Sequence, residues 1–153
     1  MLFRSKVATK LSDLSIVFKV IGANVSKKLI NVKVEEVIWT EDSEAQNISK
    51  FDIGIMPLEN TQWELGKCAY KLIQYMACGK AVVASKVGAN NAVVIDNHNG
   101  FLCSDAREWE DALTRLINDA NLRKQFGANG RLRFEQNYSL VHNLVKMKEI
   151  FNA

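Results

Sequence analysis

The chain has 153 residues, of which 48% are hydrophobic and 24% are charged. This length and composition suit one folded domain and exclude an intrinsically disordered protein. Twenty basic against 17 acidic residues leave a net charge of only +3, so neither a nucleic-acid-binding protein nor a membrane-surface protein is indicated. Three cysteines, an odd number without metal-site spacing, predict a reducing compartment, and therefore a cytoplasmic protein without a bound metal.

Short apolar segments predict the strands of the fold. Residues 15–21 are rich in β-branched side chains and end at Gly22, and residues 31–35 alternate apolar with polar side chains. Three further segments are apolar on both faces, at residues 51–56, 81–85 and 100–103. Strands of that kind are covered on both sides, which is typical of parallel sheets.

Helical periodicity fills segments between and after these strands. Apolar residues recur at i, i+3 and i+4 spacing over residues 69–77, before Gly79, and over residues 109–117, after the candidate caps Ser104 and Asp105. A last apolar stripe, beginning near Ser139, consists of Leu140, Leu144, Met147 and Phe151. Strands that alternate with helices predict a single-domain α/β fold, a Rossmann-like, doubly wound parallel sheet with helices on both faces.

The first residues do not fit such a fold. A doubly wound sheet should open with a strand and a phosphate-binding turn, whereas residues 6–11 look like the end of a helix directly before the first predicted strand. Residues 2–5 also match the translated end of a common sequencing adapter. We therefore expect residues 1–5 to be a non-native scar and residues 6–153 to be a truncated domain that lacks its first strand.

The clearest chemical pattern lies between residues 51 and 88. Ligands of a doubly wound sheet lie beyond the carboxyl ends of its strands, so the loop of residues 58–68 is predicted at a binding rim. A glycine allows close approach of a ligand, free N–H groups at a helix start attract an anion, and two lysines add positive charge. The predicted diphosphate-binding residues are Gly66, Lys67, Cys68, Ala69 and Lys71. Solvated surface lysines without a ligand remain the alternative.

The same region resembles the donor-site core of group 1 (family 4) glycosyltransferases. The matching segments are residues 51–58, 66–68, 71–85, 87–88, 99–102 and 122–139. The similarity covers nearly all of the chain after about Asp13, and the combined string is far more specific than any single glycine motif. It implies the C-terminal, nucleotide-sugar-binding half of a GT-B enzyme, in which two Rossmann-like domains face a cleft.

The resemblance also implies a reaction and its binding residues. The reaction is retaining transfer of a sugar from a UDP- or GDP-linked donor to an acceptor hydroxyl, with the charge of the leaving diphosphate stabilised without a metal. The backbone amides of residues 66–69 and the side chain of Lys71 would hold the diphosphate, and Gln74 the ribose. Trp39, Thr40 and Glu41 would lie against the base. The catalytic residues stay unassigned, because the family's acceptor domain contributes to them.

Two departures from the family pattern keep another interpretation open. The family's paired glutamates fall on Gly66 and Gln74, although the amide of Gln74 can still hydrogen-bond ribose hydroxyls. A non-catalytic binding or interaction module of Rossmann-like fold is therefore the alternative function. A nicotinamide dehydrogenase is disfavoured because the chain has no G-x-G-x-x-G motif. Cys68 and Cys78 are interpreted as small buried apolar residues.

A missing first strand would have physical consequences. It is central in the strand order 3-2-1-4-5-6, so the strands near residues 16–21 and 53–56 would each expose an edge. We expect these two strands either to pair directly or to cause self-association, and we expect the apolar face of the last helix to be partly exposed. The other expected partners are a nucleotide-sugar donor and the missing acceptor domain, without nucleic acid. The chain alone is expected to be inactive, and only the full-length enzyme, in polysaccharide or glycolipid biosynthesis, would contact a membrane peripherally.

Overall fold

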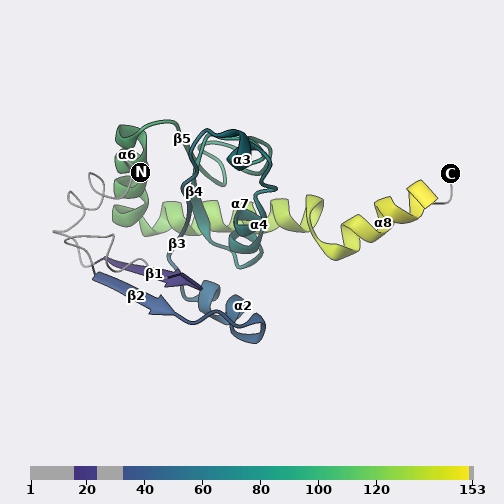
Figure 1. The fold of residues 1–153 in the computed structure, drawn as a ribbon, viewed down its shortest axis with the longest axis horizontal. Coiled ribbons are helices and arrows are strands. Elements are labelled where there is room, and N and C mark those ends of the chain that lie inside the picture. The colour runs from purple at the N-terminus through teal and green to yellow at the C-terminus, as the bar shows by residue number, and fades with distance from the viewer. Residues whose placement is uncertain (1–15, 24–32, 152–153) are drawn as a thin grey trace.

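The computed structural model describes residues 16–23 and 33–151, and it shows an α/β fold of parallel strands flanked by helices (Figure 1). The strands of the described residues are β1 (Val17–Ile21), β2 (Lys33–Val37), β3 (Ile53–Met56), β4 (Ala81–Ser85) and β5 (Gly100–Cys103). Each lies within or close to a segment that the sequence predicts. The expected scar at residues 1–5 and the helix end at residues 6–11 lie outside the described residues.

The helices include the three that periodicity predicts and four that it does not. They are α2 (Glu41–Ser49), α3 (Gln62–Leu65), α4 (Tyr70–Ala77), α5 (Asn90–Val93), α6 (Ala106–Asn118), α7 (Ala120–Asn137) and α8 (Leu140–Phe151). Of the two candidate caps before α6, Asp105 is the one used, since its carboxylate accepts from the backbone N–H groups of Arg107 and Glu108 at 2.9 Å. Thr40 caps α2 in the same way and accepts from the N–H of Ser43 at 3.2 Å.

The three-stranded sheet β3-β4-β5 is the centre of the fold. All five residues of β4 are buried, and they alternate between its two faces. Ala81 and Val83 pack with α6 and with Phe126 of α7, whereas Val82 and Ala84 pack with α4 and α5. The sheet is therefore covered by helices on both faces, which is why its strands read as continuous apolar runs.

The remaining strands form a second sheet, in which β1 pairs with β2 in parallel. Of the two expected outcomes for the strands at residues 16–21 and 53–56, direct pairing is wrong, because the described residues show no pairing between β1 and β3. Self-association through their edges stays a prediction. Ile16 and Phe18 pack against the core cluster that is formed by residues of β4, α6 and their neighbours. The helix α2 contacts α4. These contacts attach the two-stranded sheet to the rest of the fold, because no strand pairing joins β1 to β3 in the described residues.

The last helix extends away from the rest of the fold at the C-terminal end (Figure 1). Its predicted apolar stripe of Leu140, Leu144, Met147 and Phe151 is between 45% and 79% exposed. The expectation of a partly exposed face is therefore confirmed. Within the part of the chain that the structure describes, no helix combines the length and hydropathy that crossing a bilayer requires.

Candidate functional site

The carboxyl ends of the parallel strands lie next to one another and form the predicted rim. The end of β3 is tied to the end of β4, because the N–H of Leu58 donates to the hydroxyl of Ser85 at 2.8 Å. The loop after β4 packs against the end of α3, since a Cβ at Gly88 would lie 3.2 Å from the carbonyl oxygen of Leu65. Gly88 also has a positive φ of 51°, a conformation that glycine adopts without strain.

The segment between α3 and α4 contains the residues predicted to hold a diphosphate. The amides of Gly66 and Lys67 donate to the carbonyls of Trp63 and Glu64, at 3.3 and 3.2 Å, and so close the last turn of α3. In the described residues, the amides that follow, from Cys68 to Lys71, donate to no protein acceptor. They surround the start of α4, where the helix dipole presents its positive end. The amides left without a protein acceptor thus begin at Cys68, whereas the sequence predicts the diphosphate-binding amides over residues 66–69.

Both predicted lysines lie at this segment and both are paired with carboxylates. The ammonium of Lys67 lies 2.7 Å from the carboxylate of Glu64, in the preceding helix. The ammonium of Lys71 forms an ion pair with Glu44 of α2. The two lysine side chains are 42% and 47% exposed. A solvent-exposed ion pair contributes little to the free energy of folding. Either lysine can therefore exchange its carboxylate partner for a bound anion at small cost.

Glu44 is a residue of the candidate site that the sequence did not predict. Besides the ion pair with Lys71, its carboxylate accepts from the indole N–H of Trp39 at 3.0 Å and from the side-chain amide of Gln74 at 2.6 Å. One carboxylate therefore gathers the residues that the resemblance implies for the base, the ribose and the diphosphate. Glu44 is 30 residues from Gln74 in the chain, and no local motif joins them. The local signals for a helix there are a capping threonine at position 40 and acidic residues in the first turn.

The hydrogen bonds at Glu44 also set its ionisation. The bond from Lys71 holds the pKa of the Glu44 carboxyl below its ordinary value of 4.5, and the bonds from Gln74 and Trp39 act in the same direction. Burial opposes them, because it disfavours the charged form. The result is an ionised carboxylate, 14% exposed, at the centre of the cluster.

Gln74 and Trp39, which both donate hydrogen bonds to Glu44, also present groups that a ligand can contact. The side-chain carbonyl oxygen of Gln74 is buried and accepts no hydrogen bond within the described residues, so it can receive one from a hydroxyl. Trp39 is 50% exposed and packs on Gly22, where a Cβ would lie 3.0 Å from the Cβ of Trp39. Of the other predicted base-binding residues, Thr40 caps α2 and Glu41 is exposed at its first turn.

The cysteines differ from one another in exposure. Cys68 is exposed at the rim, so its interpretation as a buried apolar residue is wrong; the turn into α4 places it on the surface. Cys78 is half-buried, and burial raises the pKa of its thiol. Burial, with neighbouring carboxylates, raises the pKa of Cys103 to about 12. Among the described residues, no three His, Cys, Asp or Glu side chains cluster to hold a metal ion.

Known proteins resemble this chain in sequence. The family described as Glycosyl transferases group 1 matches residues 3–119. An uncharacterized glycosyltransferase of Methanocaldococcus jannaschii, MJ1069, is 34% identical over 94 residues, which are 60% of this chain and 24% of that protein. A second one from the same organism, MJ1178, is 25% identical over 157 residues, or 92% of this chain and 42% of that protein. The chain thus spans less than half the length of these relatives.

Solved structures share the fold. HepE of Anabaena, in complex with UDP-glucose, superposes with a TM-score of 0.73 at 16% identity, over 99% of this chain and 46% of that one. The C-terminal domain of a group 1 glycosyltransferase, LpcC of Francisella tularensis, superposes with a TM-score of 0.59 at 24% identity, over 76% of this chain and 59% of that one. The chain therefore belongs to the group 1 glycosyltransferases and has the Rossmann-like fold of a GT-B C-terminal domain.

Proposed function

We propose that the rim binds the nucleoside diphosphate of a nucleotide-sugar donor, and that the chain is the donor-binding domain of a retaining glycosyltransferase. The observation that carries the proposal is the convergence of Trp39, Lys71 and Gln74 on the carboxylate of Glu44. HepE, which shares the fold, was crystallised with UDP-glucose, and this supports a uridine nucleotide as the first candidate ligand.

The diphosphate would lie at the start of α4. The unused N–H groups from Cys68 to Lys71 and the positive end of the helix dipole favour two phosphate groups there. Lys71 would exchange Glu44 for a phosphate oxygen, which its exposure allows. When the sugar leaves, negative charge develops on the diphosphate, and these fixed donors stabilise it without a metal ion.

The nucleoside would lie between α2 and α4. The unpaired side-chain oxygen of Gln74 and the carboxylate of Glu44 can both accept hydrogen bonds from ribose hydroxyls. In this arrangement Glu44 supplies the carboxylate that the chain lacks at positions 66 and 74. The half-exposed indole of Trp39 provides a face on which a base can stack.

Transfer itself would need a second domain. The acceptor hydroxyl and the residues that activate it would come from an acceptor domain that faces this rim, so residues 6–153 alone would bind the donor without transferring the sugar. We place this reaction in the cytoplasm, in the assembly of a surface polysaccharide or glycolipid.

Titration of the purified chain with UDP and with GDP, by calorimetry at low ionic strength, tests donor binding. We expect one nucleotide to bind and Lys71→Ala to weaken it about tenfold or more, since a charged hydrogen bond is worth about 1.5–3 kcal/mol. Lys148→Ala, on α8 away from the rim, is the control that should bind like the parent chain. Absence of binding by a folded chain would contradict the proposal and favour the non-catalytic module, which the glycine and glutamine at positions 66 and 74 also suit.

A further inference from the structure

Lys71 has two competing partners at the rim. Its ammonium forms an ion pair with the carboxylate of Glu44, and its side chain is 47% exposed. Its own backbone N–H belongs to the amides from Cys68 onward, which donate to no protein acceptor in the described residues. An anion held by those amides would lie within reach of the flexible Lys71 side chain and would attract its charge. A carboxylate of the protein and an entering anion therefore compete for the same ammonium.

The carboxylate of Glu44 depends on Lys71 more than on its other two donors. Trp39 and Lys71 both donate to its Oε1 atom, Trp39 at 3.0 Å, and Gln74 donates to Oε2 at 2.6 Å. Of these three donors only Lys71 is charged, and its hydrogen bond is the largest cause of the lowered pKa of Glu44. The Glu44 side chain is only 14% exposed. Departure of the lysine therefore leaves a poorly solvated negative charge, which is costly unless another donor takes the place of the lysine.

Departure of the lysine also changes what the carboxylate can accept. Each carboxylate oxygen offers about two acceptor positions. With Lys71 in place, both positions on Oε1 of Glu44 are used and one position on Oε2 is free. Without the lysine, each oxygen has one free position. Two neighbouring hydroxyls, such as those of a ribose, match this pair of positions and replace the donor that the carboxylate has lost.

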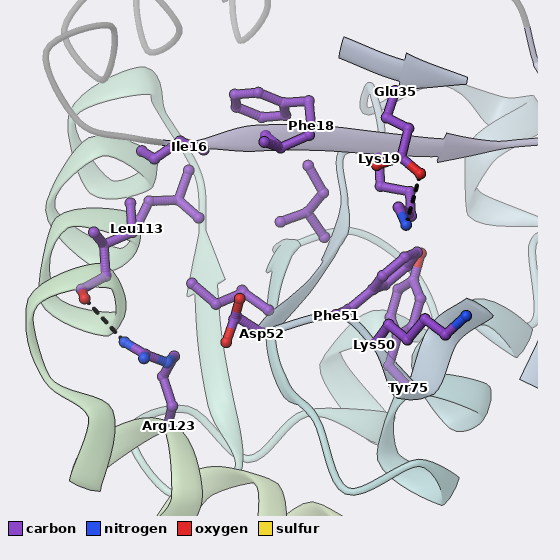
Figure 2. Close-up of a pocket in the computed structure, with 14 residues that line it drawn as sticks. Ile16, Phe18, Lys19, Glu35, Lys50, Phe51, Asp52, Tyr75, Leu113 and Arg123 are labelled. Carbon is purple, nitrogen blue, oxygen red and sulfur yellow. Dashed lines mark hydrogen bonds and ion pairs between the residues drawn. The ribbon is translucent and has the colours of Figure 1, made fainter. Parts of the chain in front are cut away.

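The exchange needs only the lysine side chain to move, because α4 itself is closely packed on β3. Tyr75 of α4 packs against Phe51, with ring centroids 6.1 Å apart (Figure 2). A Cβ at Gly54 of β3 would lie 2.4 Å from the Tyr75 ring, so the helix and the strand are in close contact. The backbone that carries Lys71 and Gln74 is therefore held in place, while the exposed lysine side chain is free to change its partner.

We propose that Glu44 makes the site specific for an intact nucleoside diphosphate over free phosphate or pyrophosphate. In the free protein its carboxylate pairs with Lys71, whereas in the complex it accepts from the ribose hydroxyls and Lys71 pairs with the diphosphate. An anion without a ribose takes the lysine and leaves the carboxylate uncompensated. A nucleoside without phosphates meets a carboxylate that the lysine still occupies, so each half of the ligand favours binding of the other. This specificity rests on the proposed nucleotide site, because it requires UDP or GDP to bind there.

Calorimetry with UDP, uridine and inorganic pyrophosphate, at low ionic strength, tests the two halves separately. Glu44→Gln should bind pyrophosphate at least about threefold more tightly than the parent chain, because no ion pair has to break. Its preference for UDP over pyrophosphate should fall about tenfold or more, since it also loses charged hydrogen bonds to the ribose. Asp42→Asn is the matched control. It removes one charge from the same exposed turn of α2 and should bind pyrophosphate as the parent chain does.

The opposite variant tests the other half of the exchange. Lys71→Ala removes an exposed side chain and should weaken the binding of pyrophosphate. It leaves the Glu44 carboxylate open to hydroxyls, so uridine should bind at least as tightly as it binds to the parent chain. Circular dichroism of each variant checks that a changed affinity does not reflect a loss of folding.

Two results would overturn this specificity while leaving the nucleotide site intact. One is pyrophosphate binding that is unchanged or weaker in Glu44→Gln, which would mean that Lys71 contacts the carboxylate and the phosphate together. The other is uridine binding that Lys71→Ala weakens. Failure of the folded parent chain to bind UDP or GDP is a different outcome, because it contradicts the proposed function itself, and the specificity of Glu44 with it.

Discussion

The two sheets of this protein are built from strands of similar length, yet only one of them is buried. Every residue of β4 is buried, whereas no residue of β1 or β2 is. The difference lies in how the sheets are covered. Helices pack on both faces of the three-stranded sheet, whereas β1 contacts the core through Phe18, together with Ile16 directly before the strand. Parallel pairing by itself does not bury a strand; packing by helices on both faces does.

The candidate site joins these two unequally covered regions. Trp39 and Glu44 follow the two-stranded sheet, whereas Lys71 and Gln74 belong to α4 on the three-stranded sheet. A nucleotide that contacts both would stabilise the less covered region most, because binding shifts stability toward the state that binds. The following substitutions test the contrast between the regions, from the largest expected effect to the smallest.

A cavity in the three-stranded region should be the most damaging change. Leu116 of α6 is fully buried, and Leu116→Ala should lower the free energy of unfolding by about 2–5 kcal/mol. Val17 of β1 is 44% exposed, and Val17→Ala should change the same quantity by less than about 0.5 kcal/mol. Urea denaturation of both variants measures the difference. Similar losses in the two variants would contradict the contrast.

Close packing of α7 on the turn before β4 gives a second test. A Cβ at Gly127 would lie 2.1 Å from the carbonyl oxygen of Gly79, so Gly127→Ala must displace backbone and should cost about 1–3 kcal/mol of stability. Gly66→Ala is the matched control, since its Cβ would lie 3.5 Å from its nearest neighbour and its φ is −78°. Thermal denaturation should show a lowered Tm for the first variant alone. An unchanged Tm would mean that α7 does not pack as the structure shows.

Removal of a helix cap should lower global stability more in the three-stranded region than in the two-stranded region. Asp105→Ala removes two hydrogen bonds at the start of α6, which packs on the core, and should cost about 0.5–2 kcal/mol of global stability. Thr40→Ala removes the hydrogen bonds of the Thr40 hydroxyl with the backbone N–H and the hydroxyl of Ser43, at the start of the largely exposed helix α2. We therefore expect faster hydrogen exchange in residues 41–49 with a smaller change in global stability. Equal global losses would show that α2 unfolds together with the core.

The smallest effect should be a pH dependence at Glu44. The pKa of its carboxyl is lowered in the folded protein, chiefly by the hydrogen bond from Lys71. The resulting stabilisation is fully present above the ordinary value of 4.5, and it is lost as the pH falls through the lowered folded-state pKa. Glu44→Gln should therefore be less stable than the parent chain at neutral pH and lose this difference in acid.

Thermal denaturation from neutral to acidic pH, at low and high salt, measures this difference. The exposed side of the Lys71 pair predicts a smaller difference at high salt. Glu41→Gln, in the same exposed turn of α2, is the control that should show no comparable acid-dependent difference. A stability difference that persists unchanged into acid would mean that the Glu44 carboxylate is not responsible.

Local sequence patterns predicted those strands and helices whose own residues form an apolar run or an apolar stripe. The boundaries of β4 and β5 agree with their apolar runs, and α4 and α6 agree with their stripes. The helices α2 and α7 were not predicted. α2 contains few apolar residues, and the buried face of α7 includes Gly127 and Gly130, which lie close to Gly79 and Met76 instead of presenting an apolar stripe.

The sequence by itself determined which segments become strands and which become the helices α4, α6 and α8, and which loops meet at the carboxyl ends of the strands, because periodicity and strand direction are local properties. Only the tertiary structure decided that the sheet divides between β1 and β3 and that Glu44 joins Trp39, Lys71 and Gln74. Contacts between segments about 30 residues apart depend on how helices pack against the sheets, and packing is a property of the whole fold.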